Sequence, residues 1–165
     1  MRLALIGVGL IGASAAWAMK RGGVFETVSA FDLSAQSARK AVEMGIADMA
    51  ADTLEACVQG ADAVLVAVPV LAIEKVMAQI EPFLEDETLV TDVGSVRGVV
   101  IEGARRALKE KFVNYAPVHP IAGGEMPGVD YADADLFVGA KAISTPVADI
   151  GDRAVQFWEN AWKTA

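Results

Sequence analysis

The 165-residue sequence predicts an α/β domain with a doubly wound, mostly parallel sheet. Short β-rich apolar runs alternate with longer segments of helical periodicity, which is the pattern of repeated βαβ units. One run, ADAVLVAVP at 61–69, is almost wholly apolar, as expected of a central parallel strand covered on both faces. Since crossovers between parallel strands are right-handed, few topologies fit, and the doubly wound nucleotide-binding fold is the leading one.

The first elements are predicted from apolar runs that end at glycines or polar residues. RLALIG (2–7) is expected to be a buried strand, and the small-residue segment 10–22 a helix that ends at a glycine pair. TVSAFD (27–32) is expected to be a second strand. Ser34 can cap the next helix, and Gly45 can end it.

The middle of the chain repeats this alternation after the central apolar strand. VLAIEKVMAQI (70–80) is predicted to be a helix, and TLVTDVGS (88–95) a strand that runs into a glycine turn. The segment 96–111 is predicted to be the next helix, and FVNYAPV (112–118) the next strand. Each helix can then cross back over the sheet to start a parallel strand.

The last segments are predicted to be a strand at 137–144 and a helix that opens at Thr145-Pro146, since proline suits a first helical turn. Apolar residues recur at helical spacing along this terminal segment: Ile150, Ala154, Phe157, Trp158, Ala161 and Trp162. Three large aromatic side chains within six residues exceed what one small face easily hides. We therefore expect part of this surface to contact a second copy, as in a homodimer, or a further helical domain.

Composition argues against several classes of partner. The formal net charge is −8 and no basic block occurs, which disfavours nucleic acids and anionic membranes. No apolar run reaches the ~18 residues of a membrane span. The single cysteine, Cys57, allows no internal disulfide and suits a reducing compartment, so we expect a cytoplasmic protein. We assign no metal ligands.

A G-x-G-x-x-G motif lies where the first strand meets the first helix. Gly7 allows the tight turn, Gly9 lets a pyrophosphate approach the backbone, and Gly12 permits close packing of helix on strand. Leu10 and Ile11 complete the turn, and we expect them to bind the cofactor as well. Because the helix N-terminus supplies free amides and a partial positive charge, a chain of net charge −8 can bind a dinucleotide without a lysine here.

The choice of dinucleotide is predicted from the end of the second strand. Asp32 lies twenty residues after Gly12, where a carboxylate can accept hydrogen bonds from the adenosine ribose and repel a 2′-phosphate. The alternative is an acidic residue that only stabilises a helix N-terminus. We predict NAD as the cofactor of a Rossmann-like domain. Val68 and Pro69, at the end of the central strand, should lie against the bound nucleotide.

Two later strand ends face the same crevice. One has the sequence TDVGSVR at 91–97, and the other has His119. A histidine here can take a proton from a hydroxyl while hydride leaves the same carbon, and Ser95 can orient it. Alternatively, His119 could bond a loop carbonyl and Ser95 could cap a helix. Gly94 is expected to contact the cofactor, and Asp92 could orient the neighbouring loops or cap the next helix.

At these positions the sequence resembles the prephenate/arogenate dehydrogenase family of tyrosine biosynthesis. The pairing of GSV with HPIAGGE is the most specific part of the resemblance. The matching stretches follow the family's order and spacing: GVGLIG at 7–12, the strand end at Asp32, AVPV at 67–70, TDVGSVR at 91–97, HPIAGGE at 119–125 and LFVGAKAISTP at 136–146.

The resemblance implies roles for residues on the catalytic side. His119 would accept the proton of the substrate's ring hydroxyl, and Ser95 would hydrogen-bond His119 or that hydroxyl. Glu125 would lie at the substrate entrance. Arg97 stands where the family commonly has lysine, and Gly124 has no side chain where relatives can offer a hydroxyl. We place Glu125, Arg97 and Gly124 in the substrate site.

The resemblance also implies a reaction, the NAD-dependent oxidative decarboxylation of prephenate or arogenate. It covers only the N-terminal half of a family member, so we expect one dinucleotide-binding domain over 1–165 without the family's helical dimerisation domain. Two alternatives are open. One is a different β-hydroxyacid dehydrogenase, which would normally use a lysine base on a later helical domain. The other is a stand-alone NAD-binding module without turnover.

Overall fold

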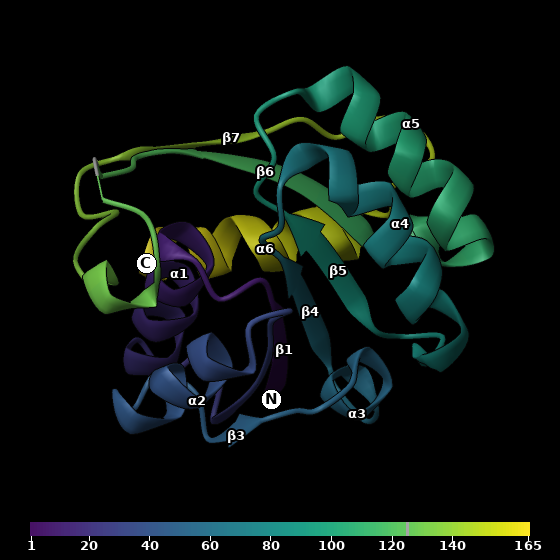
Figure 1. Ribbon diagram of the computed structural model, residues 1–165. Helices are drawn as coiled ribbons and strands as arrows, with labels where there is room; N and C mark the ends of the chain where they lie inside the picture. Colours follow the sequence, from purple (N-terminus) through teal and green to yellow (C-terminus); the bar gives the residue numbers. More distant parts are fainter. Residues whose placement is uncertain (125) are drawn as a thin grey trace.

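The computed structural model describes residues 1–124 and 126–165. In these residues one sheet has the strand order β3-β2-β1-β4-β5-β6-β7. Neighbouring strands from β3 to β6 are parallel, and β7 is antiparallel to β6 (Figure 1). The doubly wound, mostly parallel sheet is therefore confirmed. The strands are β1 (Arg2–Ile6), β2 (Thr27–Phe31), β3 (Met49–Ala50), β4 (Ala63–Val66), β5 (Leu89–Asp92), β6 (Tyr115–Ile121) and β7 (Lys141–Ser144).

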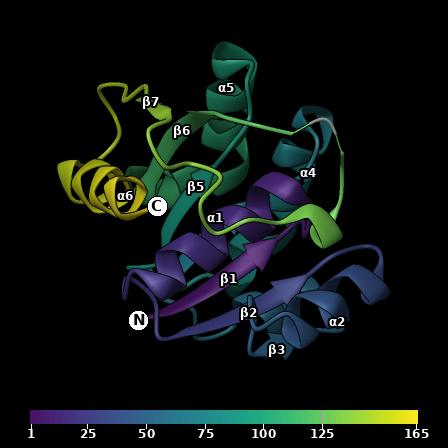
Figure 2. The same cartoon turned by 90° about the vertical axis from the view of Figure 1, so that its left-hand side faces the viewer.

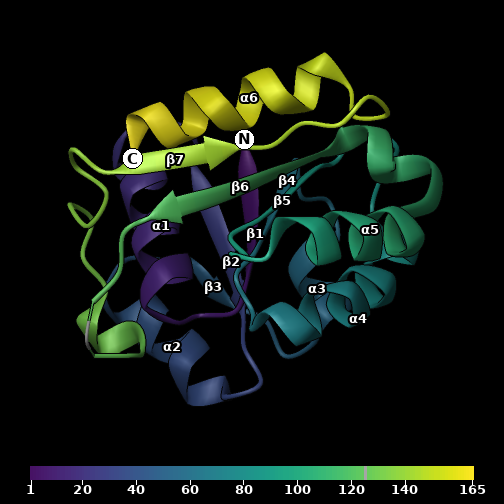
Figure 3. The same ribbon diagram turned by 90° about the horizontal axis from the view of Figure 1, so that it is seen from above.

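Helices cover both faces of this sheet. They are α1 (Leu10–Arg21), α2 (Ala35–Glu43), α3 (Leu54–Val58), α4 (Val70–Ile80), α5 (Arg97–Leu108) and α6 (Asp152–Thr164). Short 3₁₀ segments follow at Glu81–Phe83, Lys109–Asn114 and Val129–Tyr131. Seen from above, α6 and α5 lie on opposite sides of β6 (Figure 3). No helix among the described residues has the length and apolarity that a membrane crossing requires.

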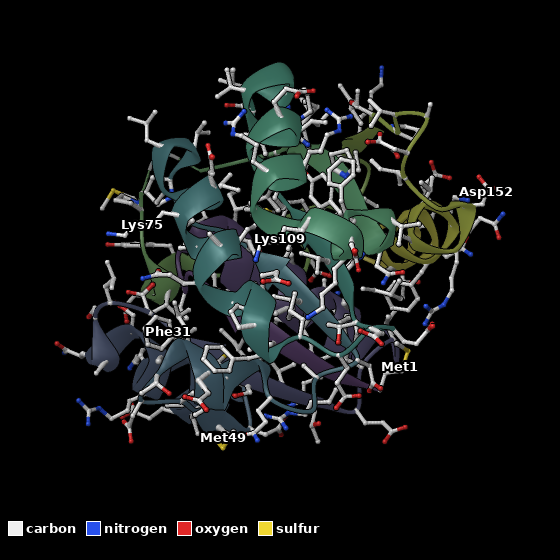
Figure 4. All side chains as sticks on the ribbon, turned by 90° about the vertical axis from the view of Figure 1, so that its right-hand side faces the viewer. Met1, Phe31, Met49, Lys75, Lys109 and Asp152 are labelled. Atoms are coloured by element: carbon white, nitrogen blue, oxygen red, sulfur yellow. The ribbon has the colours of Figure 1, made fainter. Side chains whose placement is uncertain are left out.

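Alternation of side chains along the strands divides the core into two layers. Leu3 and Leu5 of β1 pack with α1, α2 and α6, whereas Ala4 and Ile6 pack with α3, α4 and α5. Strand β4 is buried along its whole length, as predicted for a strand covered on both faces. Figure 2 shows β1 and β2 side by side in the same direction. Figure 4 looks onto the second layer, with Lys75 of α4 and Lys109 at the end of α5 labelled.

Two short elements between β2 and β4 were not predicted. Strand β3 pairs with β2 over only two residues, and α3 is a five-residue helix capped by the hydroxyl of Thr53. Neither element is long enough to show a period of its own. Both lie between the predicted helix that ends near Gly45 and the central strand.

The strand predicted at 112–118 is shifted toward the C-terminus. Residues 112–114 belong to a 3₁₀ segment, and β6 instead runs on through His119 to Ile121. The extension has a tertiary cause, because β7 returns antiparallel and pairs with residues 118–121. Strand β7 begins at Lys141 rather than 137.

The terminal helix begins at Asp152, not at Thr145-Pro146 as predicted. The backbone N–H of Gly151 donates to the Val113 carbonyl over 2.8 Å, and a Cβ at 151 would lie 2.9 Å from that oxygen. This close approach of two backbones fixes the chain just before the helix, so the residues from 145 form a connection instead of a first turn.

The apolar stripe of α6 is buried by the chain itself. Trp158 is fully buried, and Trp162 is 7% exposed and packs edge-on against Phe137 with ring centroids 5.2 Å apart. Phe157 remains partly exposed and lies 6.0 Å from the Phe25 ring. Most of the stripe is therefore core in the described residues and forms no free apolar face. A homodimer stays a prediction.

Candidate active site

The carboxyl ends of β1, β2, β4 and β5 meet at one edge of the sheet, because these strands are parallel neighbours. Figure 3 looks down on this edge, with α1 and α2 to one side and α4 and α5 to the other. In an open α/β sheet, ligands bind in the crevice outside these strand ends. The predicted cofactor residues lie at this edge, either in the connections that follow these four strands or, for Leu10, Ile11 and Gly12, at the start of α1.

The three glycines of the motif have different surroundings. Gly7 has a φ of +92°, and a Cβ there would lie 2.4 Å from the Ala67 carbonyl oxygen. A Cβ on Gly12 would lie 2.4 Å from the Gly7 carbonyl oxygen. Among the described atoms, a Cβ on Gly9 would meet nothing within 4 Å. Gly7 and Gly12 are therefore required by packing, whereas Gly9 leaves the backbone open to an approaching ligand.

The N-terminus of α1 is suited to an anion. Gly9 is the N-cap and makes no side-chain capping bond, and the first turn of α1 contains no acidic residue. The first bond of the helix is donated by Ala13 to the Gly9 carbonyl, so the amides of Leu10 and Ile11 precede the regular bonding pattern. Free amides and the helix dipole together favour a phosphate at this position.

Asp32 connects the glycine-rich loop to the start of α2. One carboxylate oxygen accepts a hydrogen bond from the Val8 amide at 2.7 Å, and the other accepts one from the Ser34 amide at 2.8 Å. Asp32 is not the helix cap, because the Ser34 hydroxyl fills that role for Ser37. The carboxylate is partly exposed and lies beside the loop, where a ribose could reach it.

The connection between β4 and α4 borders the same loop. Ala67 donates its amide to the Ile6 carbonyl at 2.7 Å and packs against both Gly7 and Gly12. Val68 is half-buried, and Pro69 is exposed as the N-cap of α4. These residues therefore lie beside the motif at the carboxyl edge of the sheet.

A buried carboxylate supports the next strand end. Asp92, the last residue of β5, is fully buried and accepts three hydrogen bonds: 2.5 Å from the Tyr115 hydroxyl, 2.6 Å from the Gly94 amide and 2.6 Å from Nη2 of Arg97. Among the described backbone amides it bonds that of Gly94 and none in the first turn of α5, whose N-cap is Val96. Asp92 therefore orients the loop between β5 and α5.

Sequence reasoning left two roles open for Asp92 and missed its partner Tyr115. Burial and the nearby Asp92 charge raise the pKa of the Tyr115 hydroxyl, so it remains a hydrogen-bond donor. A polar residue at the end of a buried strand was the available signal. The identity of its donor depends on how β5 and β6 pair.

The two predicted catalytic residues, Ser95 and His119, belong to the loop after β5 and to the neighbouring strand β6. Ser95 is exposed in the loop after β5, and it is not the cap of α5. His119 is half-buried within β6, where its backbone pairs with Ile143, rather than following the strand end as predicted. Alternation along β6 puts His119 on the face of Tyr115. In the part of the chain that the structure describes, no hydrogen bond joins Ser95 to His119.

The three residues assigned to the substrate have different positions. The Arg97 guanidinium points to Asp92, and its side chain is only 16% exposed. A Cβ on Gly124 would lie 3.1 Å from Cδ2 of Leu10, so the loop after His119 reaches the start of α1. Glu125 lies outside the described residues. Within residues 1–124 and 126–165, no three His, Cys, Asp or Glu side chains gather as a metal site would need.

Residues 15–165 match the model of the prephenate dehydrogenase nucleotide-binding domain. The chain belongs to the prephenate dehydrogenase family. It is 35% identical over 161 residues to a cyclohexadienyl dehydrogenase from Zymomonas mobilis, covering 98% of this chain and 54% of that protein. It spans about half the length, or less, of the curated prephenate dehydrogenase family relatives that it matches.

Solved structures of the prephenate dehydrogenase family have the same fold. A prephenate dehydrogenase from Aquifex aeolicus, in complex with hydroxyphenyl propionate and NAD⁺, superposes with a TM-score of 0.91 at 28% identity, covering 99% of this chain and 57% of that chain. An arogenate dehydrogenase from Synechocystis superposes with a TM-score of 0.90 at 28% identity, covering 99% and 56%. The fold of the chain therefore agrees with its assignment to the prephenate dehydrogenase family.

Proposed function

We propose that this domain binds NAD and contributes the cofactor and proton-transfer groups for the oxidative decarboxylation of prephenate or arogenate. The main observation is the open backbone at Gly9, which lies at the uncapped N-terminus of α1 and beside Asp32. Relatives named as prephenate, cyclohexadienyl and arogenate dehydrogenases support the reaction class.

The residues present fit a dinucleotide. The amides of Leu10 and Ile11 would hold the pyrophosphate, and Gly9 would let it approach because no described atom lies within 4 Å of the position of a Cβ there. Asp32 would accept hydrogen bonds from the adenosine ribose and repel a 2′-phosphate, which selects NAD over NADP. When bound, NAD⁺ supplies the hydride acceptor for the reaction.

His119 would act as the general base on the substrate. Its imidazole takes the proton of the ring hydroxyl as the carbon–oxygen double bond forms and the hydride leaves that carbon. The bond from the ring to the carboxylate then breaks, its electron pair enters the ring, and carbon dioxide is lost to give an aromatic product. Ser95 would hydrogen-bond His119 or the hydroxyl.

The choice between prephenate and arogenate is left to experiment, since relatives of both names match. Gly124 offers no hydroxyl to the part of the substrate in which the two compounds would be distinguished. The Arg97 guanidinium forms an ion pair with Asp92. We therefore propose that the Arg97 side chain contacts substrate only at the rim of the site. We treat residues 1–165 as one nucleotide-binding domain.

The test is to incubate the chain at high concentration with NAD and either substrate while NADH formation is followed. The matched variant is His119→Asn, and NAD affinity is measured for both proteins. We expect turnover to fall by at least ~100-fold in the variant with NAD affinity unchanged. Equal turnover in both proteins would contradict the role of His119. NAD binding without turnover of either substrate would favour the alternative, a binding module.

A further inference from the structure

The buried network at the end of β5 transfers neither the hydride nor the proton of the proposed reaction. Asp92 is fully buried, and none of the three groups that donate to it is a predicted hydride- or proton-transfer group. A buried carboxylate costs free energy unless charged or polar partners compensate it. A buried carboxylate at the end of β5 is therefore expected to have a specific role that offsets this cost.

The three donors come from three different parts of the fold. Tyr115 is the first residue of β6, Gly94 lies in the loop after β5, and Arg97 begins α5. A single carboxylate thus joins a neighbouring strand, a loop and a helix. The segment that these bonds enclose is 93–96, which contains Ser95.

The three partners of Asp92 offset part of the cost of burying its charge. Burial raises the pKa of Asp92, while the Arg97 charge, the Tyr115 hydroxyl and the Gly94 amide oppose the rise because each favours the carboxylate. Nε and Nη1 of Arg97 are buried and find no acceptor among the described residues, so the guanidinium has Asp92 as its one ionic partner there.

Packing also fixes the loop against the carboxylate. A Cβ on Gly94 would lie 2.9 Å from Oδ2 of Asp92 and 2.9 Å from Cδ1 of Ile73 in α4. The loop therefore has one close-packed position, between α4 and the buried network. The glycine-rich loop follows β1, and this loop follows β5. Strand β4 lies between β1 and β5, and β6, which contains His119, lies on the other side of β5.

We propose that Asp92 is a positioning residue that holds residues 93–96 in place for the nicotinamide half of the cofactor. The inference rests on the proposed function, because a dinucleotide spans the crevice and its adenosine half lies on the β1–β2 side. The loop after β5 then borders the other half. Tyr115 and Arg97 act through Asp92 and do not touch the cofactor themselves.

Two measurements on the 165-residue chain test the proposal. The first is amide hydrogen exchange of residues 93–97 without ligand, in which Asp92→Asn should exchange at least ~10-fold faster than wild type. The second compares affinity for NAD and for ADP-ribose, which lacks nicotinamide. Asp92→Asn should weaken NAD by on the order of tenfold and leave ADP-ribose within about twofold.

Two further variants make the test decisive. Tyr115→Phe removes one donor and should shift NAD affinity in the same direction by less. Asp149→Asn is the matched control, because Asp149 pairs with Arg105 of α5 at the exposed surface, and it should change neither affinity. If Asp92→Asn does not fold, Tyr115→Phe decides on the same two measurements.

The outcomes separate the inference from the function on which it rests. Equal weakening of NAD and ADP-ribose, or no weakening of either, would overturn the positioning role. Unchanged exchange of residues 93–97 would overturn it as well. A wild-type chain that binds neither ligand would instead overturn the proposed function, and the exchange measurement would still decide whether Asp92 holds the loop.

Discussion

On the β1–β2 side of the carboxyl edge the groups offered to a ligand are backbone amides, whereas on the β5–β6 side they are side chains supported by a buried charge. Gly9 and the start of α1 present amides in open space, with Asp32 bonded to the loop itself. Ser95 instead follows Gly94 in the loop that Asp92 bonds, and His119 shares a face of β6 with Tyr115, another partner of Asp92. Both regions follow strands of the same sheet.

The difference predicts which substitutions should impair ligand binding in each region. Backbone amides are positioned by the turn, so the first region should be sensitive to added volume and to φ. Side chains are positioned by their neighbours, so the second region should be sensitive to the loss of a charge or a hydrogen bond. The first can bind a common part of many ligands, and the second can be specific for one reaction.

The largest expected effect is that of Gly7→Ala. The substitution forces a side chain to a φ of +92° and to 2.4 Å from the Ala67 carbonyl, and the opposing atom belongs to the backbone. We expect a loss of at least ~3 kcal/mol in the free energy of unfolding, measured by chemical denaturation.

Gly98→Ala is the control for this change. Gly98 lies in the first turn of α5, and a Cβ there meets no described atom within 4 Å. It should leave stability unchanged or raise it by up to about 1 kcal/mol. A Gly7→Ala chain as stable as wild type would contradict the packing assigned to the turn.

Gly9→Ala should separate binding from folding within the same motif. Its φ is −93° and its surroundings are open, so stability should stay within about 0.5 kcal/mol of wild type. Affinity for NAD should fall by at least ~10-fold, because the new methyl group occupies the space of the pyrophosphate. Calorimetric titration measures the affinity, and retained NAD affinity would place the pyrophosphate elsewhere.

Asp32→Asn should have a smaller effect that depends on the cofactor. The amide keeps one acceptor oxygen, yet it cannot satisfy both the Val8 and the Ser34 amides. We expect NAD affinity to fall about tenfold and NADP affinity to fall less, since the repulsion of the 2′-phosphate is removed. An unchanged ratio of the two affinities would argue against a ribose contact.

These two regions also differ in how far the sequence predicts them. The glycine motif and Asp32 are local: their spacing alone places them at strand ends, and the structure has them there. The partnership of Tyr115 with Asp92 depends on the register in which Val90 pairs with Tyr115, and this is a tertiary property. His119 was expected after a strand, but pairing with Ile143 of β7 extends the strand beyond it.

The same reason explains the missed strand β3 and the wrongly predicted start of α6. Strand β3 exists through its contacts with β2, and α6 begins where Gly151 meets the Val113 carbonyl. The hydrophobic periodicity of a single segment cannot predict either contact, because each joins residues from different segments. The fold class and the cofactor side were predictable because they repeat a local pattern, whereas the support of the catalytic side is assembled from distant residues.

The smallest expected effect concerns Cys57, a buried group that carries no charge. Its thiol donates to the Ser29 carbonyl at 3.4 Å, and burial raises its pKa to about 11. The thiol should therefore stay protonated in the folded chain below that pH and react with a thiol reagent at pH ~8 only after unfolding. Rapid native labelling would contradict this. Cys57→Ala should cost about 1 kcal/mol of stability. It should leave NAD affinity unchanged, because Cys57 is buried in the core and is not one of the groups offered to the cofactor. The β1–β2 side does not depend on a buried charge, whereas the β5–β6 side depends on Asp92.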